Sequence, residues 1–371
     1  MSIIEILSML VGLSILVITH ESGHYLAARA FGMKVLRYSI GFGPTLFKHK
    51  PKGSDTTFQV AAIPFLAYVQ IAGMNPYEEH EEGEQGLFND QSAFARIVTV
   101  AAGPFANYLT AAILAFAIGL AGWPSRTFHA LWPDDPRAAQ AEIELPPIAG
   151  PVSEDSAAEA AGIQEGDVFV RVGETSIETF QQLQEATQAT EGAATPYVVR
   201  RGEEELTLTV TPRMNDGSAL IGVRIDEEAA QEAAMAQQGP PVELGVGEAA
   251  TMAFAVPAKI TVYQLRAIGK MIANLDSSGL GGPVEISRQF GKAAQVGPMA
   301  WFVMVMMMSV ALGLFNLLPF PALDGGRLIF LFFEVITRRK PNERFEALVH
   351  TVGIVILLVV IALVTVRDIA G

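Results

Sequence analysis

The chain of 371 residues contains no cysteine. Disulfide bonds and thiolate metal sites are therefore excluded, so any zinc ion must be held by histidine and carboxylate side chains. Histidine is also scarce, and none occurs between Ala130 and Val349. A histidine-based metal site therefore cannot be built from the middle of the chain.

Charged residues are absent from three long apolar runs, 97–123, 299–323 and 348–366, and Glu5 is the single charge between Ser2 and Thr19. Runs of this length predict membrane-spanning helices. The first run lacks a basic leading region and a small-residue cleavage site, so we expect it to be retained rather than cleaved as a signal peptide. Half of the composition is hydrophobic, and the polar remainder is too large for a pure membrane bundle. The sequence predicts four transmembrane helices and a folded part outside the bilayer.

The acidic excess belongs to one segment. Residues 134–232 hold 21 acidic and 6 basic residues in a chain of net charge −14, which disfavours nucleic-acid binding. Basic residues instead cluster after the first apolar run and between the last two: Arg29, Lys34, Arg37, Lys48, Lys50, Lys52, and then Arg327, Arg338, Arg339, Lys340, Arg344. By the positive-inside rule these two loops are cytoplasmic, which puts both termini and the acidic segment outside the cytoplasm.

Local patterns predict the parts between the apolar runs. Residues 35–47 and 57–71 are rich in β-branched and aromatic side chains and predict a membrane-associated β-hairpin, followed by a solvated acidic run. The acidic run consists of Glu78, Glu79, Glu81, Glu82 and Glu84. A glycine turn at 162–167, strands at 168–172, 197–200 and 206–210, and a helix at 179–190 predict a small α+β domain.

Two stretches after this domain have less specific patterns. Residues 227–238 are expected to form a linker or a short helix. Residues 246–272 contain Pro257 and Lys259, so we expect an amphipathic helix at the outer membrane surface rather than a crossing. A helix packed on the soluble domain is the alternative.

His20, Glu21 and His24 follow the first apolar run in the order H-E-x-x-H. Residues four apart share a helix face, so both imidazoles can bind one zinc ion while Glu21 acts on a water molecule at the metal. Ionisable groups in an apolar segment are expensive, which favours this interpretation over a structural histidine pair.

A third ligand is expected from Asp324, the first formal charge after Lys292. It lies in the sequence N-L-L-P-F-P-A-L-D-G-G, whose prolines and glycines break the third apolar run, and irregular backbone is tolerated at this depth only inside protein or beside a cavity. The first and third runs cross in the same direction, so Asp324 and the histidines reach similar depths, toward the cytoplasmic leaflet. An interfacial turn is the alternative interpretation of Asp324.

These motifs resemble the site-2 proteases. The resemblance rests on H-E-x-x-H, on G-P-x-x-N at Gly103, Pro104 and Asn107, and on N-x-x-P-x-P-x-L-D-G from Asn316 to Gly325. Gly282-Pro283-Val284-Glu285-Ile286 and a PDZ-like sequence around 162–167 resemble the bacterial RseP-like branch, although the acidic segment has room for one PDZ domain rather than two.

The resemblance implies an intramembrane zinc metalloendopeptidase that makes the second cut in regulated intramembrane proteolysis. It implies that His20, His24 and Asp324 bind Zn²⁺, that Glu21 is the general base, and that Asn316 handles the substrate backbone. Gly103, Pro104 and Asn107 are then a packing motif beside the site. The implied partners are transmembrane proteins or peptides, such as anti-sigma factors or remnant signal peptides, membrane lipid, and the product of an upstream protease presented to the PDZ domain.

The expected fold is a polytopic α-helical membrane protein of the bacterial inner membrane, with four transmembrane helices, a membrane-associated β-hairpin region and one extracytoplasmic PDZ-like α+β domain. The expected divisions are 1–32 (first helix), 33–75 (hairpin), 76–95 (acidic cytoplasmic loop), 96–125 (second helix), 126–215 (PDZ-like domain), 216–298 (linker and amphipathic helix), 299–338 (third helix with the L-D-G motif) and 339–371 (cytoplasmic loop and fourth helix). A catalytically silent membrane PDZ adaptor is the chief alternative. A metal transporter is disfavoured because no inverted repeat is present.

Overall fold

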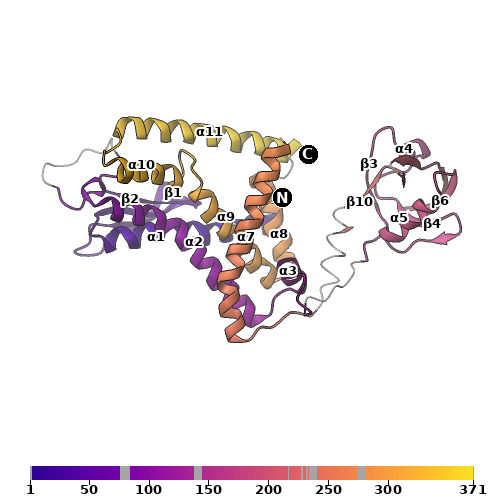
Figure 1. The fold of residues 1–371 in the computed structure, drawn as a ribbon, viewed down its shortest axis with the longest axis horizontal. Helices are drawn as coiled ribbons and strands as arrows, with labels where there is room; N and C mark the ends of the chain where they lie inside the picture. The colour runs from indigo at the N-terminus through magenta and orange to yellow at the C-terminus, as the bar shows by residue number, and fades with distance from the viewer. Residues whose placement is uncertain are drawn as a thin grey trace. The chain divides into compact units, whose positions relative to one another are not determined.

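A computed structural model describes residues 2–75, 84–137, 144–215, 217–226, 229–230, 233, 240–274 and 281–370. The chain divides into two compact units (Figure 1). One combines Met1–Trp123 with Val242–Gly371, and the other is Pro124–Pro241. The predicted acidic run, apart from Glu84, and most of the predicted linker at 227–238 lie outside the described residues.

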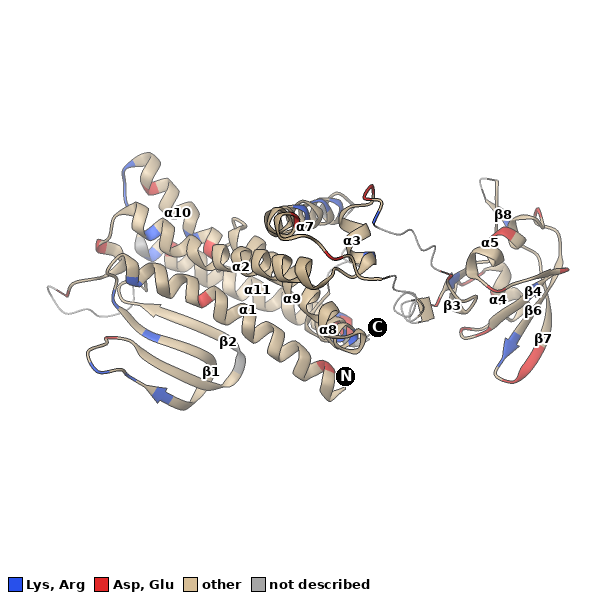
Figure 2. Cartoon of the chain, turned by 90° about the horizontal axis from the view of Figure 1, so that it is seen from below, with Lys and Arg blue, Asp and Glu red and all other residues tan. Residues whose placement is uncertain are grey.

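The first unit is built mainly from apolar helices. Its helices are α1 (Ile3–Ala30), α2 (Ala93–Ala121), α7 (Val246–Asn274), α8 (Pro283–Val296), α9 (Pro298–Leu317), α10 (Asp324–Thr337) and α11 (Glu343–Ala370), with a 3-10 turn at Phe88–Asp90. In the described part of the chain, four helices are long and apolar enough to cross a membrane: α1, α2, α9 and α11. The number of candidate spans is the one that the sequence predicts, and charged residues are sparse along these helices (Figure 2).

Sequence signals set where these helices begin and end. Ser2 caps α1 in a reciprocal capping box with Glu5, and Ser92 accepts a hydrogen bond from the Ala95 N–H at the start of α2. The third span ends at Leu317 rather than at 323, because Leu318 is extended before Pro319. α10 is therefore a separate helix that begins at Asp324.

Small residues let these helices approach one another closely. A side chain on Gly23 of α1 would collide with the Ala102 carbonyl of α2, and one on Gly313 of α9 would meet Tyr108 of α2. Helices in apolar surroundings gain their affinity from such close packing. α2 is accordingly the central helix of the unit, in contact with α1, α7 and α9.

α7 lies alongside α2 in the first unit. The Tyr108 and Thr261 hydroxyls are 3.0 Å apart, and Gly119 packs on Ala249. The predicted helix is confirmed, and it is not among the four candidate spans. Its predicted position at the outer membrane surface stays a prediction.

The predicted hairpin is present as β1 (Val35–His49) and β2 (Thr57–Ile71), which pair with several register shifts. Residues 37–40 pair with 57–60 and also with 67–70, while 45–49 pair with 58–61. The outer edges of this small sheet are therefore the stretches 67–71 and 45–49.

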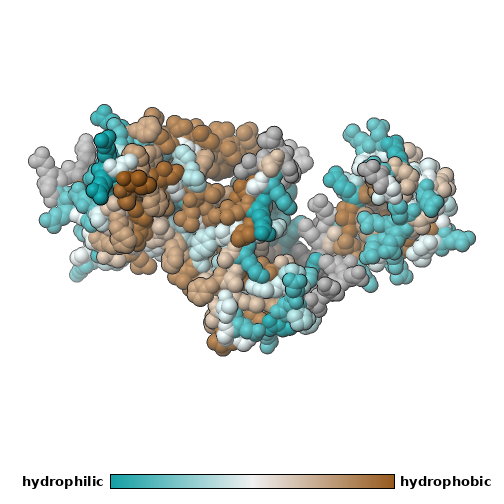
Figure 3. Space-filling view, in the orientation of Figure 1, coloured by the Kyte–Doolittle hydropathy of each residue, from teal (hydrophilic) through white to brown (hydrophobic). Residues whose placement is uncertain are grey.

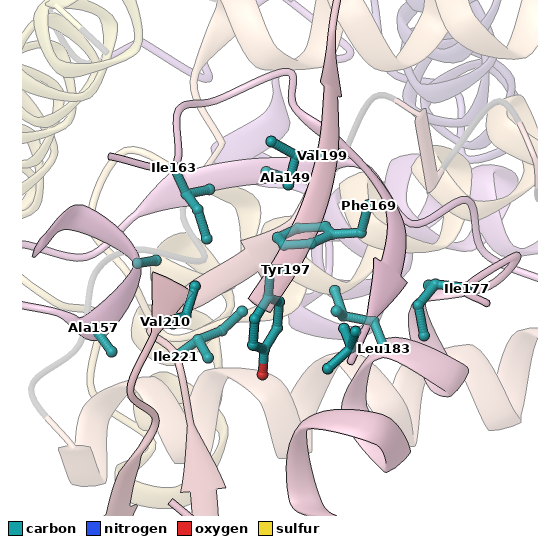
Figure 4. Close-up of a cluster of buried hydrophobic side chains, with 12 residues drawn as sticks. Ala149, Ala157, Ile163, Phe169, Ile177, Leu183, Tyr197, Val199, Val210 and Ile221 are labelled. Carbon is teal, nitrogen blue, oxygen red and sulfur yellow. The ribbon is translucent and has the colours of Figure 1, made fainter. Parts of the chain in front are cut away.

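The second unit is a small α+β fold. Its elements are α3 (Ser125–Leu131), β3 (Ala149–Val152), α4 (Ala157–Ala161), β4 (Val168–Val172), β5 (Thr175–Ser176), α5 (Phe180–Gln188), β6 (Thr195–Arg201), β7 (Glu204–Val210), β8 (Arg213–Asn215), β9 (Ser218–Leu220) and β10 (Val223–Ile225). The main sheet has the order β5-β4-β6-β7. Phe169 and Tyr197 lie at the centre of its core, together with Ile163, Leu183 and Val210 (Figure 4). The predicted strands and helix are confirmed, with the helix ending at Gln188.

An ion pair between the buried Asp167 and the partly exposed Arg201 closes the glycine turn of this unit. Asp167 accepts hydrogen bonds from Arg201 at 2.8 and 2.7 Å and from the Gln164 N–H at 2.9 Å. Burial alone would raise the pKa of Asp167, but these bonds outweigh it and hold the pKa below its ordinary value. The ion pair therefore stabilises the fold at pH values above the pKa that Asp167 has in the unfolded chain. This stabilisation is lost as the pH falls through the lower pKa of Asp167 in the folded state.

The two units differ in surface character. In the space-filling view the second unit is largely hydrophilic, whereas the surface along α11 is largely hydrophobic (Figure 3). Most large apolar side chains of α11 are exposed, which fits a helix that faces lipid.

Candidate metal centre

His20 and His24 of α1 meet Asp324 at the first residue of α10. Asp324 Oδ2 lies 3.2 Å from His20 Nε2 and 3.3 Å from His24 Nε2, and the two Nε2 atoms are 3.2 Å apart. Both histidines are 8% exposed. Three potential ligand atoms thus converge in a buried space, as the sequence predicts.

The donor set fits zinc. Tetrahedral zinc with ligand bonds of about 2.0–2.1 Å holds its ligand atoms roughly 3.3 Å apart, which matches the three observed separations. Apart from the two histidines, Asp324 Oδ2 has no hydrogen-bond partner among the described residues. Two imidazoles and one carboxylate also leave a fourth coordination position, as in catalytic zinc sites.

The protonation of His24 is fixed by α2. Its Nδ1 lies 2.9 Å from the Thr99 carbonyl oxygen, so Nδ1 carries the proton and donates, while Nε2 is left to bind the metal. Gly103, one turn later on α2, makes room for the ring, because a side chain there would collide with His24.

Asn107 of α2 orients His20 in the same way. Asn107 is fully buried, its Nδ2 lies 3.2 Å from His20 Nδ1, and its Oδ1 has no partner among the described residues. A half-turn of the amide exchanges these two atoms, so that Oδ1 accepts the Nδ1 proton of a metal-binding imidazole. The unpaired amide oxygen is therefore explained by a zinc-bound His20.

Two glycines bring Asp324 to the histidines. Side chains on Gly325 and Gly326 would collide with the carbonyl oxygens of Leu318 and Phe320, so only glycine lets the preceding loop fold back on the start of α10. The L-D-G-G sequence therefore fixes the direction in which the carboxylate leaves the helix.

Glu21 and Asn316 differ in their relation to the cluster. The Glu21 carboxylate lies beside His20, His24 and Asp324 and accepts a hydrogen bond from the backbone of Val69, on the 67–71 edge of the sheet. The Asn316 side chain instead donates to the Leu312 carbonyl one turn earlier on α9, at 2.9 Å. In this conformation Asn316 bonds its own helix, and its predicted role in substrate handling stays a prediction.

The part that α2 plays at the metal goes beyond the expectation from the sequence, in which Gly103 and Asn107 belong to a packing motif. In the structure Gly103 makes room for the His24 ring, and Asn107 faces His20. A signal was present, because Gly103 and Asn107 are four apart and share a helix face, as His20 and His24 do.

We expect Asn107→Leu to weaken zinc binding about 10–100-fold, because it removes the acceptor for the His20 Nδ1 proton. Asn107→Asp keeps an oxygen at that point and should retain most of the affinity. Competition with a chromophoric chelator, on purified protein, measures the difference. Wild-type affinity in Asn107→Leu would contradict the orienting role.

Comparisons with known proteins agree with this geometry. The sequence profile described as "Peptidase family M50" matches residues 8–360. A relative from Mesorhizobium japonicum is 31% identical over 97% of this chain and 96% of its own length, and one from Rickettsia conorii is 30% identical over 99% and 98%. A Clostridium perfringens relative is 29% identical over 97% of both chains. The names of all three describe an inferred zinc metalloprotease.

The full-length match and the metal cluster lead to one assignment. The four apolar helices make the protein a multi-pass membrane protein, and the residues placed to bind a metal ion make zinc its cofactor. The chain belongs to peptidase family M50, the site-2 protease family, and is a zinc metalloprotease.

Proposed function

We propose that this metalloprotease cleaves peptide bonds within transmembrane segments of other membrane proteins, as the second cut in regulated intramembrane proteolysis. The observation that supports this is the setting of the metal centre. His20 and His24 belong to the apolar helix α1, and Asp324 follows α9 by one short loop. Substrates of this kind include anti-sigma factors and remnant signal peptides.

The proposal includes a location and an orientation. The protein is an RseP-like protease of the bacterial inner membrane, with both termini and the second unit outside the cytoplasm and the metal centre toward the cytoplasmic leaflet. The basic residues between the spans support this orientation.

The residues around the metal have separate tasks in hydrolysis. Zinc, when bound, polarises the scissile carbonyl and makes water more acidic. Glu21 takes a proton from the attacking water and delivers it to the leaving amine as the C–N bond breaks. Thr99 and Asn107 hold the two imidazoles in the tautomer and orientation that the metal needs.

A polar cavity lies next to the loop that carries Asp324. The cavity has a volume of about 340 Å³ and is lined by polar groups that include Arg96, Arg327, Glu334 and His350. Arg327 is one helical turn after Asp324, and His350 contacts the loop before it. We propose that this cavity admits water from the cytoplasmic side.

A transmembrane substrate must unwind before its carbonyls can be attacked, because helix hydrogen bonds protect them. The 67–71 edge of the sheet is suited to receive the unwound segment as an added strand. Val69 on this edge contacts Glu21, so a strand paired there would lie beside the general base. The opposite edge, 45–49, has no such relation to Glu21 among the described contacts.

The second unit is proposed to be a PDZ-like gate that excludes substrates with bulky outer domains. The three residues of the metal cluster, His20, His24 and Asp324, all belong to the first unit. The small α+β core of the second unit supports a binding or filtering task. Capture of a new carboxyl terminus made by an upstream protease is the competing task for the same unit.

Glu21→Gln should abolish cleavage of a membrane peptide, with a loss of about 10²–10⁴-fold, while about one zinc per chain is retained. Cleavage in detergent or proteoliposomes and metal analysis of the same samples measure both. Glu5→Gln, on the same helix but in its first turn, is the control and should behave as the wild type. Zinc retention by a wild-type protein that cleaves no membrane peptide would favour the silent adaptor.

Ala67→Pro should lower cleavage about tenfold, because proline removes a backbone donor from the proposed receiving edge. Phe47→Pro on the opposite edge is the matched control and should leave cleavage within about twofold. Both variants should keep their zinc, which metal analysis checks. Equal effects of the two prolines on cleavage would argue against strand addition at 67–71.

Deletion of residues 149–225, the larger part of the second unit, distinguishes exclusion from capture. The Asp226 N–H donates to the Ile148 carbonyl at 3.3 Å, so joining these residues deletes 149–225 without stretching the chain. If the unit excludes bulky substrates, the protein that lacks 149–225 should cleave intact substrates that the full-length protein does not cleave. Loss of cleavage for both intact and pre-cut substrates, with zinc retained, would indicate capture instead.

A further inference from the structure

The loop before Asp324 has a strained backbone. Ala322 has a φ of 80°, in the left-handed region that non-glycine residues seldom adopt. That conformation costs about 1–2 kcal/mol and persists only where neighbouring contacts enforce it. Ala322 is two residues before the carboxylate that completes the metal centre, so whatever holds this backbone also sets the direction of Asp324.

α11 supplies two of the enforcing contacts. The Ala322 N–H donates to His350 Nδ1 at 3.2 Å. Gly353 packs directly on Pro321, and a side chain on Gly353 would collide with the Pro321 backbone. His350 and Gly353 are three residues apart and share one face of the helix, so α11 contacts the loop through this face.

The rest of α11 makes few contacts with the protein. Only 6% of its apolar stretch is buried, and Val352, between His350 and Gly353, is 49% exposed. Gly353 is buried in the middle of this exposed helix. The contact with the loop is therefore a local feature and does not follow from general packing of α11 in the core.

The chemistry of His350 suits this task. Nδ1 can accept the Ala322 N–H only when the ring proton is on Nε2, so the contact selects one tautomer. An aliphatic side chain in its place would leave a strained, partly buried N–H without an acceptor. Asparagine would restore an acceptor near the Nδ1 point, whereas glutamine would carry its acceptor farther from the backbone.

We infer that His350 is a positioning residue for zinc: its Nδ1 holds Ala322, and with Gly353 it fixes the loop that aims Asp324 at His20 and His24. This inference rests on the metal role of Asp324 and goes beyond the proposed function, because it assigns a task to a residue of α11 that does not touch the metal ligands. His350 acts through the loop and contributes no ligand atom.

The test is the rate at which zinc leaves purified full-length protein for a chelator in detergent. His350→Leu should release zinc about 10–100-fold faster than the wild type, the range typical of lost supporting contacts. The zinc-release rate of His350→Asn should stay within about threefold of the wild-type rate, and His350→Gln should release zinc faster than His350→Asn. Val352→Leu, on the exposed face, is the control and should match the wild type.

Wild-type release by His350→Leu, or equal rates for His350→Asn and His350→Gln, would overturn the inference. If His350→Leu does not fold, the contrast between asparagine and glutamine decides the question alone. Cleavage is measured in parallel, and we expect kcat to fall more than KM changes. A wild-type protein that binds zinc and cleaves no membrane peptide would remove the proposed function while the zinc-release result still stands.

Discussion

The close approach of α1 and α2 is the constraint on which the metal centre depends. Gly23 puts the backbone of α1 against the Ala102 carbonyl, and Gly103 lets α2 pass directly behind the His24 ring. At this separation Thr99 and Asn107 reach the Nδ1 atoms of the two histidines. A methyl group at either glycine would force the helices apart and remove both contacts together. The pairing is therefore as important to the site as the ligands themselves.

The charged side chains between α1, α2 and α10 are tolerated because they are paired with one another. His20, His24 and Asp324 face one another, and Arg96 is joined to Glu334 by two hydrogen bonds between α2 and α10. A buried charge without a partner would be strongly destabilising. The same contacts also hold α10 in place. Asp324 at the start of α10 meets the two histidines, and Glu334 farther along α10 is bonded to Arg96 of α2. Polar pairing and ligand geometry are thus one arrangement.

The remaining elements supply what a buried metal centre lacks by itself. The 67–71 edge of the sheet lies beside Glu21, and α11 contacts the loop that carries the third ligand. A cavity lined by Arg327 and other polar groups lies next to the loop before Asp324. The second unit has its own core and takes no part in the cluster.

The sequence by itself determined the four apolar helices, the hairpin strands and the pairing of His20 with His24, because helix period, strand alternation and missing charge are local properties. It also indicated Asp324, through a lone charge after an apolar run and a helix broken by proline and glycine. Only the tertiary structure decided that Asn107 faces His20, a contact between residues 87 positions apart, and that α11 holds Ala322. No local pattern states which distant backbone an amide or an imidazole will meet. Such contacts follow from how closely whole helices pack, and that distance is set by glycines whose importance appears only when the opposing helix is in place.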